Sequence, residues 1–132
     1  MRAMVFAAAL CGLWLASVPR AMAHHSAAAE FDSSKKIDLT GVVTKVEWTN
    51  PHAHFYVDVK DSTGNMVNWN LELASPNVLI RNGWKRTSLK PGDTVSVTGI
   101  RSKDNPNFGS ASMITLPDGR KLTFLAAEDQ AK

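Results

Sequence analysis

The sequence contains very little cysteine: among its 132 residues there is one, Cys11. Cys11 lies in an apolar run near the start, so the rest of the chain can form neither a disulfide nor a thiolate metal site. The sequence also lacks a phosphate-binding glycine loop, a nucleophile elbow, a haem motif and a pair of carboxylates arranged for acid–base chemistry. These absences argue against an enzyme, and we assign no catalytic residue.

The start of the chain predicts an export signal. Arg2 is followed by an apolar stretch at 4–18, and Ala21–Ala23 forms a small-x-small cleavage site. The apolar run of about 15 residues is shorter than the ~20 residues that a helix needs to span a bilayer. We therefore expect a signal peptide at 1–23 and a bacterial protein that is periplasmic or secreted, monomeric, and free of the membrane after cleavage.

After removal of this segment, the chain lacks any large excess of positive charge. Loss of Arg2 and Arg20 reduces the 15 basic residues to 13, against 12 acidic residues. A nearly neutral chain without a continuous basic stripe gives a weak electrostatic case for nucleic acid. We expect no nucleic-acid partner.

The remaining sequence predicts a mainly β domain. A short helix is expected after Ser75, with Pro76 in its first turn and Gly83 at its end. The order matches a five- to six-stranded OB-like Greek-key barrel with one short helix between strands 3 and 4, and a simple β-sandwich is the alternative. Alternation and turn residues place the strands at 37–48, 54–60, 66–73, 94–100, 110–116 and 121–124.

The apolar pattern changes phase within the first predicted strand, and composition divides the rest of the chain into parts. The apolar phase is odd at Leu39 but even at Val42, so a bulge or sharp bend is expected near Gly41. We expect 1–23 to be followed by three parts. These are a flexible N-terminal arm at 24–36, the OB-like domain at 37–125 and a polar C-terminal tail at 126–132.

The register of the second and third strands follows from parity. The apolar residues of both strands are odd-numbered, so opposed positions must sum to an even number, or one apolar set would face water. The turn at 61–65 selects one such register. The predicted pairs are Lys60 with Met66, Asp58 with Asn68, Tyr56 with Asn70, and His54 with Glu72.

The four histidines form two short pairs, His24 with His25 and His52 with His54. Cleavage before His24 would give a metal ion two nitrogens from one residue, the α-amine and the imidazole. Imidazole suits copper, zinc and nickel, and copper has the highest affinity among the divalent ions. We expect these four histidines to capture copper or a similar transition metal, with Glu72 as a ligand or as the acceptor that orients His54.

The alternative is an OB-like module that binds a glycan, a peptide or an unknown periplasmic protein without metal. The same outer face offers Tyr56, Asn68, Asn70 and Glu72 for such a ligand. A purely structural accessory subunit is a third interpretation.

Several resemblances accompany these patterns. A mature start at His24 resembles the copper histidine brace of secreted proteins such as lytic polysaccharide monooxygenases, and implies no oxidase activity because it covers little else. Thr40–Val46 resembles the first strand of periplasmic OB-fold copper and silver efflux chaperones, which implies the same fold. Their His, Met and Trp site is not reproduced, since Met66 and Trp69 have opposite parity. From His24 to Leu122 the chain resembles a family of small exported bacterial domains of unknown function.

Overall fold

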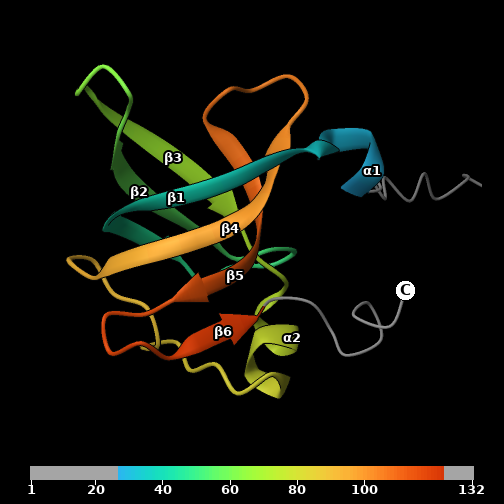
Figure 1. Cartoon of the computed structure of the whole chain (residues 1–132). Coiled ribbons are helices and arrows are strands. Elements are labelled where there is room, and N and C mark those ends of the chain that lie inside the picture. Colours follow the sequence, from blue (N-terminus) through green and yellow to red (C-terminus); the bar gives the residue numbers. More distant parts are fainter. Residues whose placement is uncertain (1–26, 124–132) are drawn as a thin grey trace, which may run out of the picture.

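The structure is a computed structural model that describes residues 27–123. The predicted signal peptide, His24, His25 and the polar tail lie outside the described residues. Figure 1 shows the elements of the described part. In chain order they are α1 (Ala27–Glu30), β1 (Phe31–Glu47), β2 (His54–Lys60), β3 (Met66–Glu72), α2 (Pro76–Arg81), β4 (Thr94–Ser102), β5 (Phe108–Thr115) and β6 (Lys121–Thr123).

The strands form one sheet that closes on itself. Its order is β3-β2-β1-β4-β5-β6 with antiparallel neighbours, and β3 also pairs with β5 in parallel. The resulting ring runs β1–β2–β3–β5–β4, with α2 in the connection from β3 to β4 (Figure 1). This confirms the predicted small, barrel-like OB topology. The short β6 lies outside the ring, against β5.

The core fills the inside of the ring. Phe55, Leu71, Val97 and Ile114 come from four different strands and are 0% exposed. Burying an apolar side chain of this size contributes about 1.5–3 kcal/mol. Within residues 27–123, the residues of the core cluster and those packed on it lie between Ile37 and Leu122.

β1 is long because it pairs with two strands in succession. Residues 31–42 pair with β4, and Gly41–Glu47 pairs with β2. The bend predicted near Gly41 is misplaced, because the register shift lies between Val43 and Lys45. Inward positions stay odd through Val43, which is 1% exposed, so Val42 faces outward.

Gly41 is needed for a different reason, the close approach of two strands. A Cβ atom at this position would overlap the backbone carbonyl oxygen of Asp58 in β2. The glycine therefore allows the backbones of β1 and β2 to approach each other closely.

The N-terminal boundary of the domain also differs from the expectation. Residues 27–36, expected in a flexible arm, form α1 and the first part of β1. Phe31 pairs with Ser102 and is 3% exposed. Its ring packs on Phe108 with centroids 5.3 Å apart. One buried aromatic anchors a segment whose Ala- and Ser-rich composition suggested no anchor.

The predicted β2–β3 register is confirmed at every pair, from His54 with Glu72 to Lys60 with Met66. The turn between the strands is shaped by Asp61. Its Oδ1 accepts hydrogen bonds from the backbone N–H groups of Thr63 at 2.8 Å and Asn65 at 2.9 Å.

The helix α2 also begins as predicted. Ser75 caps it, because its hydroxyl accepts a hydrogen bond from the Val78 N–H at 3.4 Å. Pro76 follows, and Gly83 with a φ of +87° reverses the chain after the helix. Neither helix in residues 27–123 has the length and apolar character required to cross a bilayer.

Candidate functional site

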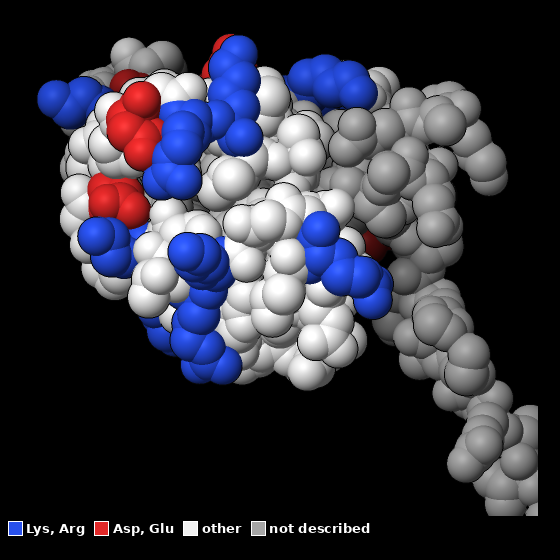
Figure 2. Space-filling view, turned by 90° about the horizontal axis from the view of Figure 1, so that it is seen from below, with Lys and Arg blue, Asp and Glu red and all other residues white. Residues whose placement is uncertain are grey.

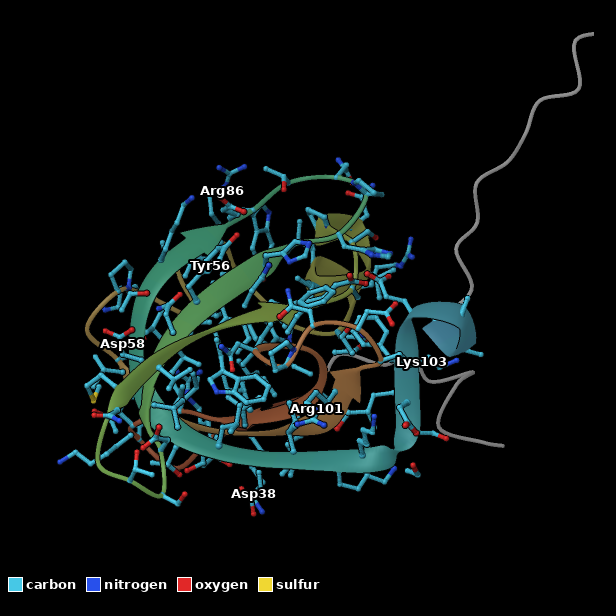
Figure 3. All side chains as sticks on the ribbon, turned by 90° about the horizontal axis from the view of Figure 1, so that it is seen from above. Asp38, Tyr56, Asp58, Arg86, Arg101 and Lys103 are labelled. Carbon is cyan, nitrogen blue, oxygen red and sulfur yellow. The ribbon has the colours of Figure 1, made fainter. Side chains whose placement is uncertain are left out.

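The outer side of β2 and β3 carries a row of polar side chains, which we call the histidine face. In Figure 3, Tyr56 and Asp58 lie on the outside of the ring. Because successive side chains of a strand alternate between faces, the even-numbered residues of both strands share this side. The histidine face consists of His52, His54, Tyr56, Asp58, Asn68, Asn70 and Glu72.

His52 precedes β2, yet it joins this face. Backbone pairing continues beyond the strand, since Ala53 donates its N–H to Ala74 O at 3.1 Å and accepts from Leu73 N at 2.8 Å. The Nδ1 atom of His52 lies 2.6 Å from Oε1 of Glu72. The imidazole is half exposed, whereas the Glu72 side chain is only 14% exposed.

His54 is held by a hydrogen bond and by an aromatic ring. Its Nδ1 lies 2.9 Å from Oδ1 of Asn70, and its ring stacks on Phe108 with centroids 6.2 Å apart. An amide oxygen can only accept, so Nδ1 carries the hydrogen, and Nε2 of the neutral ring keeps its lone pair. This is how proteins commonly prepare a histidine to bind a metal through Nε2.

The partners of the two histidines differ from the expectation. Glu72 lies opposite His54 in the register but bonds His52, and His54 bonds Asn70 instead. Both contacts run diagonally, two positions along β3 from the directly opposed residues. Side chains at diagonal positions of a twisted antiparallel pair lie within reach of each other. Glu72 is therefore the orienting acceptor of His52.

The beginning of the described chain lies close to this face. Burial raises the pKa of the Glu72 carboxyl, the adjacent His52 opposes the increase, and the negative charge of Glu30 adds to it. Glu30 is the last residue of α1. The next residue, Phe31, contacts the Phe108 ring that stacks on His54. The chain thus enters the fold beside Glu72 and His54.

Tyr56 extends the face toward β1. Its hydroxyl donates a hydrogen bond to Oε2 of Glu47 at 3.2 Å, and the Lys45 ammonium lies 5.2 Å from its ring centroid. Lys45 also forms an ion pair with Glu47, which lowers the pKa of that carboxyl. Burial, followed by the nearby Glu47 charge, raises the pKa of Tyr56. The tyrosine is therefore a neutral donor at ordinary pH.

The predicted glycan- or peptide-binding residues are engaged with side chains of the protein itself. The Asn68 amide donates to Oδ1 of Asp58 at 2.7 Å and to the Thr44 hydroxyl at 3.2 Å. Asn70 is occupied by His54, as Glu72 is by His52. A ligand at this face would have to replace these bonds.

Sequence reasoning missed the residues that reach this face from other strands. Glu47 and Lys45 come from β1, and Phe108 comes from β5. Their places depend on the β1–β2 register shift and on the parallel β3–β5 pairing. The apolar pattern of β1 indicates a change of phase without placing it, and no local pattern indicates the β3–β5 pairing.

The described residues supply two candidate metal ligands. Two imidazoles share one face, each with an oxygen partner at Nδ1. Among residues 27–123, no group of three or more His, Cys, Asp or Glu side chains is arranged to hold a metal ion. His24 and His25, the other expected ligands, lie outside the described part. Complete coordination would require donors from beyond it.

Comparison with models of protein families relates the chain to one of them. A model for a family of unknown function, DUF6152, matches residues 13–111, three quarters of the chain. The matched span contains both histidine pairs. A search of curated proteins found no match.

Proposed function

We propose that this chain, which belongs to the DUF6152 family of unknown function, is a small exported protein that binds a transition-metal ion, preferably copper. The ligands are His52 and His54 of the histidine face together with the α-amine and imidazole of His24. His25 is a further candidate ligand. The observation that supports this most is the oxygen partner at Nδ1 of both described imidazoles. The proposed role is capture of an ion rather than catalysis.

The chemistry of the donors favours copper among the common metals. Imidazole nitrogen is a ligand for copper, nickel and zinc, and the divalent affinity order places copper first. An acceptor at Nδ1 fixes the ring and makes Nε2 a better donor. The mature chain has no thiolate that would draw zinc into a cysteine site.

Chain length allows the N-terminus to join these histidines. Ala27, the first described residue, follows His24 by three positions, so their Cα atoms are at most about 11 Å apart. α1 leads directly into Phe31, whose ring packs on the Phe108 ring that stacks on His54. This arrangement supports a site completed by the chain start, as in the histidine brace.

The test is copper binding by the chain that starts at His24, which retains all of the described residues, 27–123. We expect one Cu(II) ion per chain and nitrogen coupling in its EPR spectrum. His24→Ala and His54→Ala should each lower the affinity about 100-fold or more, because each removes a direct nitrogen ligand. Competition titration measures the affinity.

Asp58→Asn is the matched control, since it changes an outward residue of β2 that touches no histidine. Its affinity should stay within about twofold of the unmodified chain. Unchanged copper affinity in both histidine variants would contradict the proposal. A native first residue other than His24, read by mass spectrometry, would remove the α-amine from the site.

A second prediction separates the orienting acceptor from the ligands. Asn70→Ala removes the acceptor at Nδ1 of His54 but leaves the imidazole in place. We expect copper affinity to fall about 10-fold while the nitrogen coupling persists. Asn68→Ala, on the same strand and face but bonded to Asp58 and Thr44, should leave affinity unchanged. The reverse order of effects would contradict an orienting role for Asn70.

The alternative function is a glycan-, peptide- or protein-binding face without metal. The internal hydrogen bonds of Asn68, Asn70 and Glu72 weigh against it, because a ligand must replace them at a cost. Failure to bind copper stoichiometrically would leave this alternative as the better account of the face.

A further inference from the structure

One end of the fold gathers cationic side chains that the metal proposal does not use. We call it the basic end; it comprises α2, the connection 82–93, the turn 116–120 and β6. These segments are joined, since the Trp84 indole N–H donates to Thr123 O at 3.2 Å. Residues of 87–93 and 116–120 line a shared hollow of about 240 Å³. Figure 2 views this end and shows more Lys and Arg than Asp and Glu.

The charge of this end differs from that of the remaining domain. It has two acidic residues, and both are engaged: Asp93 accepts from the Lys90 N–H at 2.9 Å, and Asp118 pairs with Arg120 at 2.7 Å. The rest of residues 27–123 holds six basic and eight acidic residues. The basic end has six exposed cations, namely Arg81, Lys85, Arg86, Lys90, Arg120 and Lys121.

The basic end also carries an exposed apolar side chain. Ile80 of α2 is 56% exposed, and Arg81 follows it directly. Two other residues of the helix, Pro76 and Leu79, are buried in the domain. An exposed apolar side chain on a surface rich in cations is the composition by which proteins bind an anionic bilayer surface. The cations contact phosphate groups, and the apolar group enters the headgroup boundary.

We infer that the basic end docks on a bilayer rich in anionic phospholipid, with Ile80 inserted at the headgroup boundary. The net negative charge of the remaining domain would turn that part away from the same surface. A bilayer fits better than nucleic acid, because a polyanion in water offers no apolar layer for Ile80. The inference does not depend on metal binding. It departs from the sequence expectation that the chain is free of the membrane after cleavage, because that expectation considered only a spanning segment.

The experiment is cosedimentation of the chain starting at His24 with vesicles. One set is phosphatidylcholine alone, and the other contains about one third phosphatidylglycerol. We expect at least about tenfold tighter binding to the anionic vesicles, and a loss of this preference at high salt. Lys85→Gln with Arg86→Gln should weaken anionic binding about 25-fold, near fivefold per charge. Ile80→Ser should weaken it about fivefold at any salt concentration.

The matched control removes two exposed lysines outside the basic end, Lys36→Gln with Lys60→Gln. This variant should bind within about twofold of the unmodified chain. Equal binding to both vesicle types, or an equal loss in the control, would overturn the inference. So would binding to a DNA duplex that depends on Lys85 and Arg86 but not on Ile80, without preference for anionic vesicles. Circular dichroism confirms that each variant is folded.

Discussion

Replacing Gly41 with alanine is expected to lower the free energy of unfolding by about 3 kcal/mol. The new Cβ would overlap the carbonyl oxygen of Asp58, which is backbone and cannot rotate away. Gly41 pairs with Val59 on one side and with Val95 on the other, so displacement of β1 disturbs two pairings at once. Urea denaturation followed by circular dichroism measures the loss.

The neighbouring residue provides the control for this substitution. Thr40 is exposed, and its hydroxyl bonds only the Ser96 hydroxyl, at 3.0 Å. Thr40→Ala should therefore change stability by no more than about 0.5 kcal/mol. If Gly41→Ala is as stable as Thr40→Ala, then the backbones of β1 and β2 do not approach each other as closely as the structure shows.

Removal of the Trp84 side chain should have a still larger effect on stability. Trp84 is 2% exposed and belongs to the core cluster, so Trp84→Ala should cost about 4 kcal/mol. Trp84→Phe keeps most of the packing but leaves the Thr123 carbonyl without the indole donor, at a cost of about 1–2 kcal/mol. The same denaturation experiment measures both variants.

This substitution also tests the role of the aromatic residue that follows α2. An aromatic residue just after a short helix can either pack under the ring or line a ligand groove, and the burial of Trp84 supports packing. Lys85→Ala, at the exposed next position, should be nearly neutral. A similarly neutral Trp84→Ala would mean that the indole contacts solvent and lines a groove.

The β2–β3 hairpin could be predicted in full because two constraints act together. Both strands bury their odd-numbered residues, so a slip of one position would turn Phe55 or Leu71 toward water. The five-residue turn after Lys60 then leaves one register. The signals for strands, turns and helices also lie within a few residues of the element that they predict. Ser75 and Pro76, which begin α2, are an example.

The rest of the site could not be predicted because it depends on contacts between distant segments. The apolar residues of β1 indicated a change of phase but could not place it, since Val42 is apolar and faces outward. Without that shift, the Glu47 carboxylate cannot be placed within reach of the Tyr56 hydroxyl. The exchange of histidine partners depends on strand twist, which the order of residues does not encode locally.

The parallel pairing of β3 with β5 has the fewest residue pairs of the strand pairings in the ring. Asn70, Leu71 and Glu72 lie opposite Phe108, Gly109 and Ser110. Asn70 and Glu72 also hold the two imidazoles, and Phe108 stacks on His54. Closure of the ring and alignment of the histidines therefore use the same few residues. A local opening of the ring at this junction would therefore separate Phe108 from His54 and expose the buried Leu71 in the same step.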